Sequence, residues 1–400
     1  MSSRYYQLRL TAVIALLLLI TACVGGRNLR SMTQPVSPPA PIIDSSEGNA
    51  ACEAIARDFS EADHQSLISR VDSSFIAWRV LSVNEKNQLS QISHETIEKR
   101  LKQQLKVMLA LGDDGVQWDM LSGRVDGGRY LCLVRSRLSE QGVRYLEFDL
   151  RLADGKLRIM DWYDLIRKAR VSDLFQELFR DINEIAYAHY MALPKMRASI
   201  EQEQKLYADF IGATRSGDPK RALAIYNKLP PRLRNKPLYI FIAVNMASKL
   251  DDAQYLLFLR DLARRVGDDG RYSMVLLDLY MMDRQYDEAN RVLREFKLQI
   301  GSDPLLEVLL ANLELEQGNK QLFYRYCLQA LEEDAAYLDT YWVLLDQFVA
   351  DRNYRDAVLI LNVLSNMFQM NLQAGAFESD DKYREFSRSA AFKEWLAKAT

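Results

Sequence analysis

Four side chains close together in the sequence could carry proton-transfer chemistry. Asp149 and Asp161, with Tyr130 and Tyr163, lie on or beside segments whose polarity alternates as in β-strands. A carboxylate or a phenol can act as a general base or acid when an apolar cleft shifts its pKa towards the working pH. The same alternation turns several of these side chains away from any core. We therefore expect no enzyme and keep catalysis as part of an alternative hypothesis.

Other signs of catalysis or cofactor binding are missing from the sequence. The histidines, His64, His94 and His189, are far apart and lack the spacing of a metal site. Residues 112–115 (Gly-Asp-Asp-Gly) have the wrong ligand spacing for a calcium loop. No GxSxG, HExxH, Walker A or GxGxxG motif stands in a supporting context. We expect no metal and no cofactor.

The N-terminus carries a different chemistry. Residues 1–22 hold two arginines and then an apolar run too short to span a membrane, and small residues precede Cys23. This order resembles the bacterial lipobox, which implies lipid transfer to the Cys23 sulfur and cleavage before it. Val24 rather than Asp follows, so the resemblance implies a lipid-anchored protein of the cell envelope at the periplasmic face of the outer membrane. An ordinary secretory signal with a chance cysteine is the alternative.

Charge and cysteine content limit the partners and the compartment. The formal net charge is −2, and cleavage of residues 1–22 would remove two further positive charges, so nucleic acid is not expected as a partner. Cys52, Cys132 and Cys327 remain after Cys23. An odd count in an oxidising compartment leaves at least one unpaired. Cys132 and Cys327 lie among apolar residues, which is typical of small buried side chains, and a Cys52–Cys132 disulfide is the alternative.

The chain between the lipid anchor and the repeats predicts a tether, a small domain and a linker. Residues 23–49 are rich in Pro, Ser and Gly, which is typical of a semi-extended spacer. Residues 50–167 begin with helical periodicity and then change to period two, which predicts helices on a four-stranded antiparallel sheet. The predicted strands are 118–125, 130–138, 143–152 and 157–163. Their outline resembles the NTF2-like and cystatin-like group. Residues 168–204 predict a helical linker that Pro194 interrupts.

Residues 205–400 show an internal repeat of thirty-four residues. Ala289, Phe323 and Ala357 stand at one position of successive units. Such a period is typical of paired antiparallel helices that stack as a solenoid. Residues 285–289 (Gln-Tyr-Asp-Glu-Ala) and 353–357 (Asn-Tyr-Arg-Asp-Ala) resemble the entry to the second helix of tetratricopeptide repeats.

The match to tetratricopeptide repeats is incomplete. Leu277, Ala311 and Leu345 stand where that family has its first-helix glycine. The resemblance implies a mainly α protein, a helical solenoid behind a small α+β domain. We expect residues 382–398 to form one capping helix.

The resemblance also implies which side chains line the inner face of the array. Carried over position by position, one ladder is Asp278, Asn312 and Asp346. Two neighbouring ladders are Met274, Val308, Trp342 and Arg271, Leu305, Asp339. Aligned acids and amides can bind basic side chains or hydrogen-bond to a peptide backbone, and a tryptophan is a frequent binding hot spot. A solvated helix face without a ligand is the alternative.

These features predict a membrane-anchored periplasmic scaffold or adaptor that binds a protein or peptide partner through the repeats. The alternative function is a small-ligand-binding or enzymatic NTF2-like domain, with the repeats as a recruiting arm. A purely structural spacer is the third hypothesis.

Overall fold

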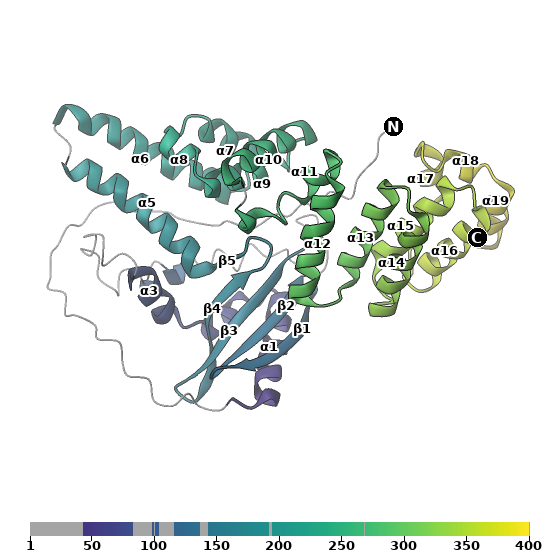
Figure 1. Cartoon of the computed structure of the whole chain (residues 1–400), viewed down its shortest axis with the longest axis horizontal. Helices are drawn as coiled ribbons and strands as arrows, with labels where there is room; N and C mark the ends of the chain where they lie inside the picture. Colours follow the sequence, from purple (N-terminus) through teal and green to yellow (C-terminus); the bar gives the residue numbers. More distant parts are fainter. Residues whose placement is uncertain are drawn as a thin grey trace. The chain divides into compact units, whose positions relative to one another are not determined.

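The computed structural model describes residues 43–82, 98–99, 101–103, 116–136, 143–191, 194–267 and 269–399. The protein is mainly α-helical with an α+β part near its N-terminus, as the sequence predicts (Figure 1). It forms two compact units, residues 1–279 and 280–400. Cys23 and most of the predicted tether lie outside the described residues. The helical periodicity also predicts a helix at residues 94–111, most of which likewise lies outside the described residues.

The sheet of the first unit is antiparallel and has the strand order β1-β2-β3-β4-β5. Four strands were expected, and the fifth is a two-residue addition that pairs with the end of β4. It forms because the chain turns back after Asp164, whose carboxylate accepts hydrogen bonds from the backbone N–H groups of Ile166 and Arg167. The strands are β1 (Trp118–Asp126), β2 (Arg129–Ser136), β3 (Tyr145–Ala153), β4 (Lys156–Asp164) and β5 (Ala169–Arg170).

Helix α1 (Ser45–Ser60) packs on the sheet and is followed by α2 (His64–Arg70) and α3 (Ser73–Ser82). It begins inside the range predicted as tether, because Asp44 caps it by accepting from the Ser46 N–H. Aromatic rings fill the space between α1 and the sheet. Phe59 stacks on Trp118 with 4.4 Å between ring centroids, and Phe148 lies 5.7 Å from Trp162.

A series of helices completes the first unit. Helix α6 starts at Pro194, where the sequence predicts a break, and proline suits the first position of a helix. The helices are α5 (Val171–Met191), α6 (Pro194–Arg215), α7 (Pro219–Tyr226), α8 (Pro231–Arg234), α9 (Pro237–Ala247), α10 (Asp252–Val266), η2 (Gly270–Tyr272) and α11 (Leu277–Met282), within which the first unit ends.

The repeat pattern predicts a helix at residues 271–282, and this helix is not continuous. The short 3-10 helix η2 and a turn stand before α11. Asp269 caps η2 by accepting from the Arg271 N–H, and the Ser273 hydroxyl donates to the Gly270 carbonyl. Lys168, from the α+β part, donates a 3.2 Å hydrogen bond to Ser273. These contacts hold the segment in a tighter turn than an α-helix allows.

The second unit holds helices in pairs. The second helix of each pair begins at Tyr286, Lys320 and Tyr354, in steps of thirty-four residues. The helices are α12 (Tyr286–Ile300), α13 (Pro304–Glu316), α14 (Lys320–Glu333), α15 (Leu338–Ala350), α16 (Tyr354–Asn366), α17 (Ala374–Ser379), α18 (Arg384–Ser387) and α19 (Ala390–Ala399).

The expected single capping helix at residues 382–398 is wrong. The chain forms α18 and α19 with a break between them. The Ser389 hydroxyl accepts a hydrogen bond from the Phe392 N–H, and therefore starts a new helix there.

Candidate functional site

In the second unit, the predicted partner-binding side chains lie on the first helices of two pairs. Asn312 is on α13, and Asp339, Trp342 and Asp346 are on α15; all four are half-buried. Their exposure leaves them within reach of a ligand. The register partners Leu305 and Val308 are buried instead, so these two ladder positions belong to the core.

Asp346 already has partners within its own unit. Its carboxylate forms an ion pair with the Lys382 ammonium group and accepts a hydrogen bond from the Tyr383 hydroxyl. The Lys382 nitrogen lies 5.5 Å from the centre of the Tyr383 ring. The acid therefore binds a cation and a phenol that come from the segment between α17 and α18.

The other polar residues of α15 differ in their surroundings. Burial raises the pKa of Asp339. Trp342 is half-buried, and its ring contacts no other aromatic ring among the described residues. An indole in this setting can receive an aromatic or apolar side chain from another molecule.

The three predicted site residues of the first unit are held more tightly. The Arg271 guanidinium is exposed but bound to the Asp269 carboxylate at 2.8 and 2.5 Å. Met274 is 2 % exposed, so its side chain belongs to the core. Asp278 accepts a 2.8 Å hydrogen bond from the Tyr255 hydroxyl. Burial raises the pKa of Asp278 to about 7, and the bond from Tyr255 acts in the opposite direction.

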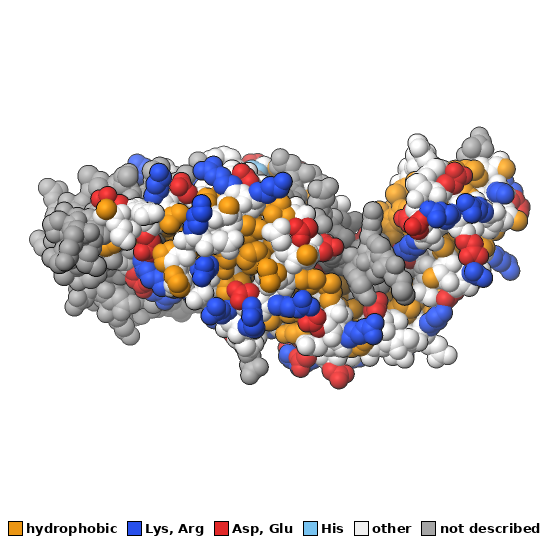
Figure 2. Space-filling view, turned by 90° about the horizontal axis from the view of Figure 1, so that it is seen from above, with side chains coloured by type: hydrophobic (Ala, Val, Ile, Leu, Met, Phe, Trp, Pro, Cys, Tyr) orange, Lys and Arg blue, Asp and Glu red, His pale blue; other side chains and the backbone are white. Residues whose placement is uncertain are grey.

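The ladder of Asp278, Asn312 and Asp346 is therefore divided between the two units. Its continuity along one surface stays a prediction. Figure 2 shows basic and acidic side chains interspersed on one face of the molecule. The described part of this face shows no continuous patch of basic side chains, as nucleic-acid binding requires.

The strand acids considered for catalysis lie directly opposite each other. Asp149 and Asp161 are cross-strand partners beside a β-bulge, and both are almost fully buried. Arg151 binds Asp149 at 2.9 Å through its guanidinium. Asp161 accepts 2.6 and 3.2 Å hydrogen bonds from the hydroxyl and N–H of Ser172, and Arg79 lies 3.6 Å away. Burial raises the pKa of Asp161 despite these contacts. Each acid thus already has an arginine or a hydrogen-bond donor of the protein itself as its partner.

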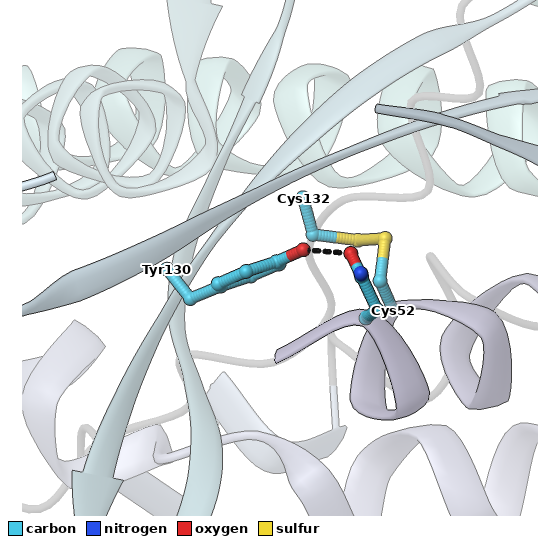
Figure 3. The surroundings of a disulfide bond; sticks show 4 residues. Cys52, Tyr130 and Cys132 are labelled. Atoms are coloured by element: carbon cyan, nitrogen blue, oxygen red, sulfur yellow. Dashed lines mark hydrogen bonds between the residues drawn. A yellow bond between two sulfur atoms is a disulfide. The ribbon is translucent and has the colours of Figure 1, made fainter. Parts of the chain in front are cut away.

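Tyr130 does not join these acids in one site, whereas Tyr163 follows Asp161 by two residues on β4 and lies on the same face of that strand. Figure 3 shows Tyr130 and Cys132 pointing from the sheet towards the helix that carries Cys52. The Tyr130 hydroxyl donates to Asn49, on the same helix. The two cysteines form a disulfide, which answers the question the sequence leaves open. Tyr163 is half-buried, and burial raises its pKa.

Sequence reasoning missed a buried polar cluster in the first unit. Asp181 on α5 is fully buried, pairs with the Lys236 ammonium group and accepts a 2.7 Å hydrogen bond from the Tyr239 hydroxyl. Its position carried a usable signal, because Asp181 lies three residues after Leu178 and four before Ile185 on the apolar stripe of α5. An acid on that stripe requires a partner.

No group of three or more histidines, cysteines or acids suited to a metal occurs among the described residues. Within the same residues, none of the helices has the length and apolar content needed to cross a bilayer. No protein-family model, curated protein or solved structure matches this chain.

Proposed function

We propose that this chain is a membrane-anchored periplasmic scaffold or adaptor that binds a protein or peptide partner through the inner face of its helical repeats. One observation carries the proposal. Helices α13 and α15 have equal lengths and begin thirty-four residues apart. The starts of α12, α14 and α16 are also separated by thirty-four residues. Units of this period stack so that equivalent side chains recur along one surface, and such surfaces bind extended partners.

The chemistry of α15 supports binding rather than catalysis. Asp346, Trp342 and Asp339 offer acid groups and an indole at half-buried positions. Such side chains can take basic and aromatic groups of a partner. The mixed charges of the surface in Figure 2 are consistent with a protein partner rather than nucleic acid.

The proposed location rests on two features. The sequence around Cys23 resembles a lipobox, and several acyl chains would hold the protein on a membrane. The Cys52–Cys132 disulfide supports an oxidising compartment, because such bonds persist in the periplasm and are rare in the cytosol. Cys23→Ser should therefore release the protein from the membrane fraction, and retention of the variant there would remove the lipid anchor from the proposal.

The decisive experiment is site-specific photo-crosslinking in cells. A photoreactive residue at position 342 tests the inner face, and one at position 328 is the control, since Leu328 on α14 is 59 % exposed. We expect one protein to be enriched at position 342 and absent at position 328. Equal recovery at both positions, or no enriched protein, would favour the spacer hypothesis.

A ligand-binding or enzymatic first domain remains the second candidate, because burial raises the pKa of Asp161 as a general base requires. The aromatic packing of Phe59, Trp118, Phe148 and Trp162 weighs against it, since these rings occupy the interior beside α1. A small-molecule screen by thermal shift, with Asp161→Asn as the control, distinguishes the two. A hit that disappears in Asp161→Asn would favour the second candidate.

A further inference from the structure

The segment that binds Asp346 is built differently from the rest of the array. Helices α13 and α15 are single first helices of 13 residues. One repeat after α15, the chain forms only α17, of 6 residues, and α18, of 4 residues. Neither short helix has a side-chain cap at its start. Short uncapped helices open at low cost in free energy.

Buried aromatic rings anchor this segment on both sides of its exposed residues. Phe377 on α17 and Phe386 on α18 are buried, and both rings contact Phe392 on α19, at 5.4 and 5.1 Å between centroids. Between them, Asp380, Asp381 and Lys382 are exposed. Displacement of the Lys382–Tyr383 step from Asp346 would therefore break the contact of the Tyr383 ring with Phe377, while the contacts of Phe377 and Phe386 with Phe392 can stay in place.

The two groups on Asp346 define the chemistry that this position accepts. Lys382 supplies a cation whose side chain is 47 % exposed, and Tyr383 supplies a phenol whose ring also packs against Phe377. Trp342 stands one helical turn before Asp346 and is half-buried. A partner that presents the same two groups would satisfy the acid, and its flanking residues would reach the indole.

We propose that Asp346 recognises a partner segment that carries a basic residue next to a tyrosine, and that the chain's own Lys382–Tyr383 step occupies this position until the partner displaces it. The proposal rests on the adaptor function above and names the chemistry of the partner. The internal occupant lowers the apparent affinity by the fraction of molecules in which the position is closed.

The test uses the full chain and a labelled peptide that copies residues 378–385 (Glu-Ser-Asp-Asp-Lys-Tyr-Arg-Glu). Fluorescence anisotropy compares the wild-type chain with the double variant Lys382→Ala/Tyr383→Phe. Phenylalanine keeps the ring on Phe377 and removes only the hydroxyl, so the cluster stays packed. We expect the double variant to bind the peptide about fivefold more tightly, because the internal competitor is gone.

Two controls make the result specific. Asp346→Asn added to the double variant should abolish the gain in affinity, and a peptide with Ala and Phe in place of its Lys and Tyr should show no gain. Equal affinities for the wild-type chain and the double variant would overturn the proposal, as would a gain that survives Asp346→Asn.

Failure of this inference is distinguishable from failure of the adaptor function. If a partner is crosslinked at position 342 but the double variant binds the peptide no more tightly than the wild type, the adaptor function is supported and the role of Asp346 is rejected. If the double variant binds the peptide more tightly through Asp346 but no partner is crosslinked, the recognition chemistry is supported and the adaptor function is rejected.

Discussion

The hydroxyl of Tyr255 on α10 donates a 2.8 Å hydrogen bond to the carboxylate of Asp278 on α11. Burial raises the pKa of Asp278 from 3.8 to about 7, although this bond lowers it. The carboxyl group therefore changes charge near neutral pH in the folded protein, whereas in the unfolded chain it is ionised well below that pH.

This shift makes the stability of the first unit depend on pH. Between about pH 4 and about pH 7 the folded state holds a proton that the unfolded state has lost. The free energy of unfolding should therefore fall as pH rises through this window, by up to about 1.4 kcal/mol per pH unit. Denaturant unfolding of wild type and Asp278→Asn across the window checks this, since the amide does not titrate.

The control for this prediction is Asp154→Asn, a change at an exposed acid of the same unit. Other acids with raised pKa, such as Asp161, give the same sign but are present in all three proteins. The expected result is a flatter pH profile for Asp278→Asn only. Parallel profiles for the wild type and Asp278→Asn would show that the group ionises normally.

Much of the helical array could be predicted because its signals are local. The repeat pattern predicts a helix at residues 338–350 that coincides with α15, because an apolar stripe and clear turns define both ends. The segment before α11 could not be predicted, because it depends on a hydrogen bond between Lys168 and Ser273, 105 residues apart.

The same limit applies to the candidate site. The repeat register selected Asp278 and Asp346 by their spacing. Their hydrogen bonds from Tyr255 and Tyr383 are tertiary contacts, which no local pattern encodes.

The Cys52–Cys132 disulfide should contribute strongly to stability. It closes a loop of 80 residues between α1 and β2, and both cysteines are fully buried. Chain-entropy arguments give about 4 kcal/mol for a loop of this size. Cys52→Ala/Cys132→Ala should lose free energy of unfolding of this order, measured by urea denaturation. A reductant should destabilise the wild type and leave the double variant unchanged; equal sensitivity would argue against the bond.

Gly48 should not tolerate a methyl group, although it lies in a helix. A Cβ there would stand 2.2 Å from a ring carbon of Tyr130, beside the disulfide. Gly48→Ala should therefore destabilise by about 1–3 kcal/mol through overpacking. Gly212→Ala is the matched control, because Gly212 is also helical and its Cβ would meet nothing within 4 Å. That change should be neutral or stabilise by up to about 1 kcal/mol, and thermal unfolding separates the two.

The buried carboxylate of Asp181 should depend on Lys236. Asp181 has no exposed surface, and its charge is balanced by the Lys236 ammonium group and the Tyr239 hydroxyl. Lys236→Met removes the cation and leaves a buried charge without compensation, so the free energy of unfolding should fall by about 3–5 kcal/mol. Lys249→Met, at an exposed lysine of the same unit, should change it by less than about 0.5 kcal/mol.

A second substitution identifies the cause of that loss. Asp181→Asn in the Lys236→Met background removes the uncompensated charge and keeps an acceptor for the Tyr239 hydroxyl. The double variant should therefore be more stable than Lys236→Met alone when both are measured by denaturant unfolding near neutral pH. If the double variant were less stable, the loss in Lys236→Met would come from packing of the lysine chain, and the ion pair would not be what holds α5 to the start of α9.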